Sequence, residues 1–233
     1  MITLGIDLSS MPEGTAACCV DWLKNCAVAK APSLSCADNE LDTLISKANA
    51  IGIDAPFGWP EAFVAAVTNW TDDAWTTEAR DRFRFRETDR AVRDRIGRWP
   101  LSVSTDRIAL PAMRAMALLH RHEVTNLSGD GRFFEVYPAG SLFCWELRCR
   151  GYKRIDEECL GFRNEILRQL RKKLPWLDVP ETYAESSDTL DALVAALTVR
   201  VAVQGATIKP SSTQIASAQH EGWIHLPSDW PRL

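Results

Sequence analysis

Short apolar runs bounded by Gly, Pro, Asn or Asp recur along the chain and predict β-strands. Two successive runs are separated only by Lys24 and Asn25, which predicts a β-hairpin. Two later runs stop at Pro56 and Pro138, because proline cannot donate a ladder hydrogen bond. The predicted strands are Ile2–Leu8, Thr15–Leu23, Cys26–Ala31, Ile51–Asp54, Arg132–Tyr137 and Gly222–Leu226.

Longer segments repeat apolar residues at helical spacing. One of them, Ser187–Val203, is almost wholly apolar, so we expect this helix to be buried on several sides. Between Gly58 and Trp99 the composition changes, with four of the nine tryptophans and many arginines, and we expect a helical insertion at about residues 57–104. The other predicted helices are Asp38–Ala48, Asp106–His122, Ser141–Arg150 and Asp156–Leu174.

The order of these elements predicts one α/β domain over residues 1–233. A hairpin followed by strands that alternate with helices gives a mixed sheet with helices on both faces. Ligand sites in such sheets lie beyond the carboxyl ends of the parallel strands. We therefore expect functional residues at those ends.

Two of these strand ends carry the same tripeptide, Gly-Ile-Asp, which places Asp7 and Asp54 at the edge of the core. A carboxylate there is costly unless it is paired, hydrogen-bonded or bound to a metal. We expect the glycine two places before each aspartate to leave room between the carboxylates. Glu135 lies in a further strand, and Asp188 and Asp191 are three residues apart on one helix face.

Several carboxylates in one cleft repel each other unless cations bind them, and hard oxygen ligands favour Mg²⁺ or Mn²⁺. Two such ions, about 3.5–4 Å apart, activate water and stabilise the leaving oxygen in phosphodiester cleavage. We therefore predict Asp7, Asp54, Asp188 and Asp191 as metal ligands, with Asp7 bridging both ions. The same four residues and Glu135, which would position water, form the predicted catalytic set.

Each carboxylate also has a purely structural interpretation. Asp188 is suited to cap its helix, where the positive end of the helix dipole would favour Asp191. Asp7 is suited to accept backbone hydrogen bonds from the loop that follows it, at Ser9 and its neighbours. For any one acid alone this interpretation is the stronger, whereas for the set together we favour the metal site.

Six stretches spread over nearly the whole chain resemble the DUF429 family, which is grouped with predicted nucleases of the ribonuclease H-like fold. These stretches are GIDLSSMPEGTA, IDAPFGWP, RFRETDR, EVYPAG, SSDTLDALVAALTVR and EGWIHLP. The resemblance implies a ribonuclease H-like mixed five-stranded sheet with strand order 3-2-1-4-5 and strand 2 antiparallel, flanked by helices. It also implies acids at the end of strand 1, near the end of strand 4 and on a late helix, which Asp7, Asp54, Asp188 and Asp191 fit.

The paired acids of the late helix look most like the resolvase-type branch of this fold, and two other features depart from its general pattern. That pattern has an acid on the first helix, and Asp38, Glu40 and Asp42 at the start of the first predicted helix give no clear match. Glu135 belongs to the family's own motif and has no assigned role in the nuclease scheme.

The segment Arg80–Arg98 holds eight arginines in nineteen residues, with aromatic residues among them. Arginine forks bind phosphates and aromatic rings stack on unpaired bases, so this segment is a candidate phosphate clamp. The acids between the arginines equally favour a salt-bridged surface helix, and the tryptophans are more typical of a small core within the insertion. Our candidate substrate-binding residues are Arg86, Thr88 and Asp89, which match the family motif, and Ser9; Thr88 is equally suited to cap a helix.

Composition restricts the class of protein further. Hydrophobic content of 46%, charged content of 25% and a net charge of −4 are typical of a globular soluble protein and argue against one that simply coats nucleic acid. No apolar run is long enough to span a bilayer, and no leader precedes the first strand. The seven cysteines form no CxxC pair, so we expect reduced thiols in the cytoplasm and no zinc site.

Together these patterns predict a metal-dependent nuclease that acts on DNA or RNA. An ATP-dependent phosphotransferase of the sugar kinase and actin type is an alternative, because that group shares this sheet and Asp7-Leu-Ser-Ser resembles its first phosphate loop. The absence of a second Gly-rich phosphate loop argues against it. A binding protein whose acids are structural is the third interpretation.

Overall fold

The structure is a computed structural model that describes residues 1–70, 75–129 and 131–233. Its strands are β1 (Ile2–Asp7), β2 (Ala16–Trp22), β3 (Ala27–Ala29), β4 (Ser33–Leu34), β5 (Ala50–Asp54), β6 (Phe133–Glu135) and β7 (Leu177–Asp178). In the described part of the chain they form one seven-stranded mixed sheet in the order β6-β5-β1-β2-β3-β7, with β4 paired to β2. β1 is parallel to β5 and antiparallel to β2.

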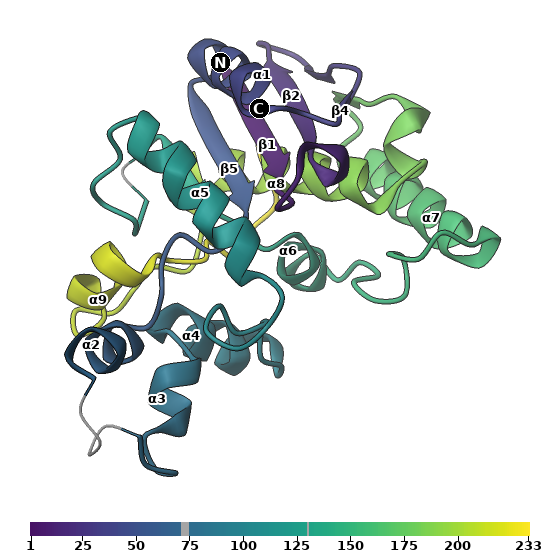
Figure 1. Ribbon diagram of the computed structural model, residues 1–233. Coiled ribbons are helices and arrows are strands. Elements are labelled where there is room, and N and C mark those ends of the chain that lie inside the picture. The colour runs from purple at the N-terminus through teal and green to yellow at the C-terminus, as the bar shows by residue number, and fades with distance from the viewer. Residues whose placement is uncertain (71–74, 130) are drawn as a thin grey trace.

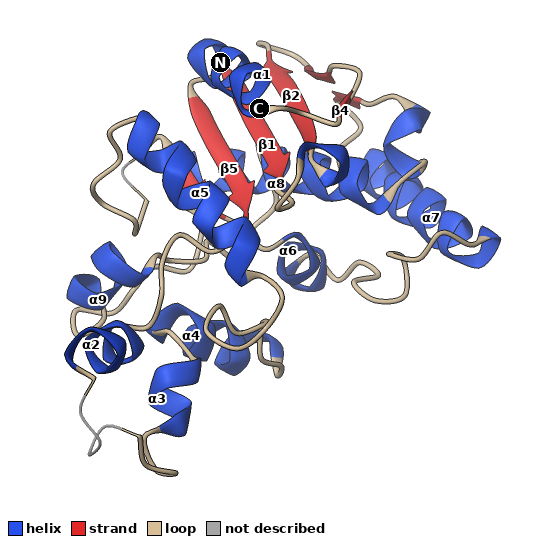
Figure 2. Ribbon diagram, viewed as in Figure 1, coloured by secondary structure: helices blue, strands red, loops and turns tan. Residues whose placement is uncertain are grey.

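Helices cover both faces of this sheet (Figure 1; Figure 2). They are α1 (Asp38–Lys47), α2 (Glu61–Asn69), α3 (Arg80–Arg84), α4 (Glu87–Ile96), α5 (Ala109–Arg121), α6 (Pro138–Cys144), α7 (Glu157–Lys173), α8 (Ser187–Val203) and α9 (Ile215–Glu221). Short 3-10 turns form at η1 (Pro12–Gly14) and η3 (Glu181–Ala184). α1 and α5 pack on one face of the sheet, and α6, α7 and α8 form a core on the other.

Alternate residues of the central strands point to opposite faces of the sheet. Leu4 and Ile6 of β1 lie in one core with Ile51 of β5, Ile45 of α1 and Leu118 of α5, and all five are buried. The residues between them in β1 and β5 face α8. The strand-end aspartates therefore lie on the α8 side of the sheet.

α8 rests directly on β1 and β5 because both strands carry glycine at the crossing point. A Cβ on Gly5 would lie 2.0 Å from the backbone oxygen of Ala192, and one on Gly52 would lie 2.9 Å from that of Ala195. The expectation that these glycines leave room between the carboxylates is therefore wrong, since the helix backbone fills that room. α8 begins and ends where the sequence predicts, and most of its residues are buried.

Between β5 and α5 the chain forms α2, α3 and α4, which correspond to the predicted helical insertion; residues 71–74 of it lie outside the described part of the chain. Glu221 of α9 connects two of these helices, because its Oε1 and Oε2 accept the backbone N–H groups of Glu61 and Glu87, each at 2.8 Å. The predicted tryptophan core is not seen for Trp70 and Trp75, which are 72% and 45% exposed.

The mixed α/β architecture is confirmed, whereas the predicted count of five strands is wrong. β4 and β7 contain two residues each, too few to give a readable alternation of apolar and polar positions. The order of the complete sheet therefore differs from the predicted 3-2-1-4-5. The predicted strand Gly222–Leu226 is reduced to an isolated parallel bridge between Ile224 and Glu135.

No helix in the described residues combines the length and the apolar character needed to cross a membrane. All seven cysteines are free thiols. Burial raises the pKa of the Cys18 and Cys19 thiols, which makes both poor nucleophiles at neutral pH.

Candidate functional site

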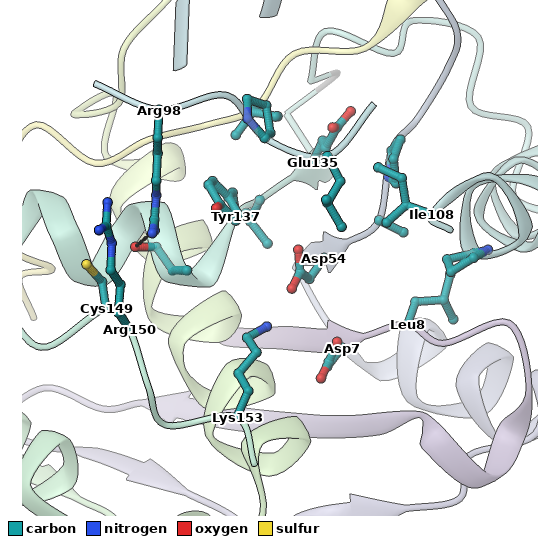
Figure 3. A pocket seen from close by; sticks show the side chains of 18 of the residues that line it. Asp7, Leu8, Asp54, Arg98, Ile108, Glu135, Tyr137, Cys149, Arg150 and Lys153 are labelled. Atoms are coloured by element: carbon teal, nitrogen blue, oxygen red, sulfur yellow. Dashed lines mark hydrogen bonds between the residues drawn. The ribbon is translucent and has the colours of Figure 1, made fainter. Parts of the chain in front are cut away.

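The carboxyl ends of β1 and β5 place two aspartates side by side. Asp7 and Asp54 are directly paired across these parallel strands, and neighbouring strands lie about 4.8 Å apart. Both side chains are half-buried, and both line one pocket of about 510 Å³. Their carboxylates face into this pocket (Figure 3), where neither has a hydrogen bond or ion pair with another described residue.

The first turns of α8 bring two more acids to the same edge of the sheet. Ser186 caps this helix, since its Oγ accepts the N–H of Thr189 at 3.0 Å, and Asp188 is therefore not the cap. Asp191 is fully buried. The negative charges of Asp191 and Asp188 both act on Asp7, so acids from three elements gather at one place.

A lysine from the loop between α6 and α7 reaches into this acidic cluster. Lys153 Nζ lies 2.7 Å from Asp191 Oδ2, and the Tyr152 hydroxyl donates to Asp191 Oδ1 at 2.8 Å. Figure 3 shows the Lys153 side chain pointing toward Asp7 and Asp54. Asp191 is thus committed to two protein partners, whereas Asp7 and Asp54 are not.

The position of this loop is set by Arg163 of α7, which is only 4% exposed. Its guanidinium donates to the carbonyl oxygens of Tyr152 and Arg154 at 2.7 and 3.0 Å, and to that of Ala184 at 2.8 Å. One buried arginine therefore joins the Lys153 loop to the segment that leads into α8.

The electrostatics of the cluster reflect an excess of negative charge. Burial, followed by the charges of Asp191 and Asp54, raises the pKa of Asp7 well above its usual value. Burial also raises the pKa of Asp54 to about 7; Lys153 opposes this increase and Asp191 adds to it. For Lys153, burial lowers the pKa, but the charges of Asp191 and Asp54 outweigh burial and leave the pKa raised. The site therefore favours the entry of a further cation or proton.

The fit of these residues to a metal ion is partial. No group of three or more His, Cys, Asp or Glu side chains in the described part of the chain is arranged to hold a metal, so the four predicted ligands do not form a complete set. Asp7 and Asp54 nevertheless offer adjacent carboxylate oxygens that make no hydrogen bond or ion pair within the described residues. Mg²⁺ is commonly held by one or two carboxylates together with substrate phosphates and water, and this pair matches that need.

Arg86 makes no hydrogen bond to Asp7, Asp54, Asp188 or Asp191. All the hydrogen bonds of its guanidinium go to other protein groups. It donates to Glu135 through two bonds of 2.9 and 2.7 Å, to Asp89 through bonds of 3.2 and 3.0 Å, and to the carbonyl oxygen of Glu221 at 3.0 Å. These bonds account for all five N–H donors of an arginine. Arg86 is 2% exposed and offers no donor to a phosphate.

Asp89 and Thr88 complete this network. Glu135 belongs both to the network and to the lining of the pocket that holds Asp7 and Asp54, and its charge also acts on Asp54. Glu135 also accepts the backbone N–H of Phe57 at 2.9 Å, and Thr88 Oγ1 accepts that of Ile224 at 2.6 Å. Burial raises the pKa of Glu135 although Arg86 opposes the increase. The network thus joins the insertion to β6 and to the chain after α9, which gives these residues a structural role. The catalytic role of Glu135 and the substrate-binding roles of Thr88 and Asp89 stay predictions.

The backbone of Ser9 is hydrogen-bonded within the protein. Its backbone N–H donates to Thr15 Oγ1 at 3.3 Å, and its carbonyl oxygen accepts from Arg114 at 2.9 Å. Ser9 does not line the pocket that contains Asp7. The sequence-predicted site therefore divides into Asp7, Asp54, Asp188 and Asp191, which the fold brings together, and residues that hold the surrounding structure.

Sequence reasoning missed Lys153, Tyr152 and Arg163. Lys153 lies in the stretch RGYKR between two predicted helices, where a basic residue is typical of a solvated loop. A signal was present for Arg163, which stands among the apolar positions of α7, but an isolated arginine on a basic helix is not distinctive.

A family model described as "Protein of unknown function (DUF429)" matches residues 5–214. No curated protein and no solved structure matches the chain. The matched region contains both paired aspartates, both acids of α8 and Lys153, and on this match the chain belongs to the DUF429 family.

Proposed function

We propose that this protein is a divalent-cation-dependent hydrolase of phosphodiester bonds in DNA or RNA, with Mg²⁺ or Mn²⁺ held by Asp7 and Asp54. The observation that carries the proposal is the pairing of these residues across β1 and β5, with both carboxylates facing a pocket and neither hydrogen-bonded nor ion-paired to a described residue. Two adjacent, half-buried carboxylates that carry charge without a partner are costly, and a bound cation offsets that cost.

The arrangement of the strands supports a ribonuclease H-like fold as part of this proposal. The path β6-β5-β1-β2-β3 runs through the sheet with β2 antiparallel, and the acids stand at the ends of β1 and β5 and on α8. β4 and β7 would then be additions to that core. A likeness of fold does not by itself define a reaction, so the proposal rests on the acids.

Each residue has a distinct part in the proposed reaction. Asp7 and Asp54 would hold the cation, which would activate a water molecule and polarise a phosphoryl oxygen when bound. Asp191 is fixed by Tyr152 and Lys153, and its charge adds to the attraction for the cation. Lys153, whose side chain is 56% exposed, neutralises charge on the phosphate that enters the pocket.

The two-ion scheme expected from the sequence needs Asp188 or Asp191 as a ligand of the second ion. The oxygens of Asp191 are bonded to Tyr152 and Lys153, and Oδ1 of Asp188 accepts from the Ser187 hydroxyl at 2.9 Å. We therefore assign one cation to Asp7 and Asp54; a second ion would need either the remaining oxygen of Asp188 or the departure of Lys153 from Asp191.

The proposal is tested with a panel of single strands, duplexes, hybrids and branched junctions of DNA and RNA, incubated with Mg²⁺ or Mn²⁺. Wild type and the control variant Asp178→Asn, which alters an exposed acid of β7, are expected to cleave at least one substrate. Asp7→Asn is expected to reduce cleavage to background. The absence of cleavage by wild type, or equal cleavage by Asp7→Asn, would contradict the proposal, and ATP turnover would then favour the phosphotransferase.

A further inference from the structure

Positively charged side chains gather on the side of the pocket opposite the paired aspartates. Arg98 follows α4, and Arg150 lies in the loop between α6 and α7, three residues before the Lys153 that pairs with Asp191. Figure 3 shows Arg98 and Arg150 extending toward each other beside Tyr137, away from Asp7. The pocket is thus divided into an acidic end and a basic end.

Arg98 has hydrogen-bonding capacity that the protein does not use. Its Nε is buried and has no hydrogen-bond partner among the described residues. One terminal nitrogen makes only a long bond of 3.5 Å to the carbonyl oxygen of Ala139, and the guanidinium carbon lies 5.9 Å from the centre of the Tyr137 ring. A buried N–H without a partner is costly, which points to a ligand that accepts from it.

The other arginines of the Arg80–Arg98 segment differ from Arg98 in this respect. Arg86 is saturated by the internal network described above. Arg90 pairs with Glu87 at 3.3 Å, and the guanidinium of Arg93 lies 4.8 Å from the centre of the Trp99 ring. Arg98 is therefore the member of the segment that combines a place in this pocket with an unused donor.

We propose that Arg98 and Arg150 form a phosphate-binding subsite, which holds a backbone phosphate next to the one at Asp7 and Asp54. Two guanidinium groups offer planar pairs of N–H donors, which match the oxygens of a phosphate. The identification of this ligand as nucleic acid rests on the proposed function. The predicted phosphate clamp would then consist of the last arginine of the segment and a loop residue, and would not involve Arg86.

Binding without catalysis tests the subsite independently of hydrolysis. Short labelled single strands of DNA and RNA are titrated in the presence of a chelator, with fluorescence anisotropy as the readout, at several salt concentrations. The variants are Arg98→Gln, Arg150→Gln and the control Arg82→Gln, which alters an exposed arginine of α3 in the same segment. Inorganic phosphate, compared with chloride at equal ionic strength, serves as the competitor.

We expect Arg98→Gln and Arg150→Gln each to weaken binding by about 10-fold and to reduce the salt dependence by about 0.7 in slope, with Arg82→Gln near wild type. Phosphate should compete with the wild type more strongly than chloride does, and less so with Arg98→Gln. Arg98→Lys, which keeps the charge and loses the fork, should recover part of the affinity and serves if Arg98→Gln is unstable.

Equal binding by wild type and both pocket variants, or an equal loss in Arg82→Gln, would overturn the subsite. If wild type binds no oligonucleotide, calorimetry with inorganic phosphate decides: heat that is lost in Arg98→Gln supports a subsite for small phosphates, and no heat overturns it. Retained binding without any cleavage overturns the proposed hydrolase and leaves the subsite intact.

Discussion

Asp7 and Asp54 stand opposite each other on parallel strands, and the same register pairs Gly5 with Gly52 two residues earlier. The repeated Gly-Ile-Asp tripeptide therefore performs the same three tasks twice. The glycine receives the backbone of α8, the isoleucine packs in the core on the other face, and the aspartate faces the pocket.

Removal of the negative charge of Asp7 should stabilise the folded protein when no divalent cation is present. In Asp7→Asn the repulsion by Asp191 and Asp54 is removed while the size of the side chain is kept. We expect the free energy of unfolding to rise by about 1 kcal/mol, or the melting temperature by about 2–4 °C. Thermal unfolding with a chelator measures this, with Asp178→Asn as control; a lower melting temperature would mean that Asp7 has a favourable protein partner.

The close approach of α8 to β1 and β5 predicts a ranking of three glycine-to-alanine substitutions. Gly5→Ala places a Cβ 2.0 Å from a backbone oxygen of α8, so we expect a loss of about 3 kcal/mol or more. Gly52→Ala meets a more distant atom and should cost less. Gly161→Ala, inside α7 with nothing near the new Cβ, should stabilise by about 0.5–1 kcal/mol. Urea unfolding of the three variants checks this ranking, and a neutral Gly5→Ala would disprove the close contact.

Arg86 should matter for stability and not for nucleic-acid binding. Arg86→Leu leaves the buried carboxylates of Glu135 and Asp89 without their common partner, which typically costs about 3–5 kcal/mol. The exposed control Arg82→Ala should stay within about 0.5 kcal/mol of wild type.

Denaturant unfolding and oligonucleotide binding are measured on the same variants of Arg86. If Arg86→Leu does not fold, Arg86→Lys keeps the charge and allows the binding measurement. A stable Arg86→Leu protein with reduced salt dependence of binding would instead support the original phosphate clamp.

A buried histidine predicts a loss of stability in mild acid. Burial lowers the pKa of His225 from 6.5 to about 4. Its Nε2–H donates to the carbonyl oxygen of Ser128 and its Nδ1 accepts from Thr207 Oγ1, both at 3.0 Å, so the neutral ring fits the site. Because the unfolded chain binds this proton near pH 6.5, stability should fall by about 3 kcal/mol as the pH is lowered from 6.5 to 4.

The contribution of His225 is measured by urea unfolding across this pH range. His225→Gln should reduce the slope of stability against pH, because no imidazole remains to be protonated on unfolding. His120→Gln, at an exposed position of α5, should leave the slope as in wild type. Equal slopes in all three proteins would mean that His225 titrates normally in the folded state.

The sequence is most informative where one periodic pattern has one structural solution. The apolar segment of α8 and the alternation in β1 and β5 lead to the observed elements, and the strand-end rule brings Asp7 and Asp54 together. Each element follows from a local pattern, and the strand-end rule holds whatever the separation of the strands along the chain.

The sequence is least informative where the partner of a residue is far along the chain. Arg86 meets Glu135 across 49 positions, and Lys153 meets Asp191 across 38; neither pairing has a spacing that a linear pattern displays. The role of Gly5 and Gly52 is equally hidden in the linear sequence, because it depends on contact with α8. The two-residue strands β4 and β7 are too short for any periodicity to appear.

Binding of Mn²⁺ to the chelator-treated protein tests the central claim most directly. Calorimetric titration of wild type and Asp178→Asn should give saturable binding, whereas Asp7→Asn and Asp54→Asn should each abolish or strongly weaken it. All four proteins need to be folded at the start, which their unfolding curves establish. Saturable binding that survives both Asp7→Asn and Asp54→Asn, or no binding by wild type, would contradict the assignment of the cation to the paired aspartates.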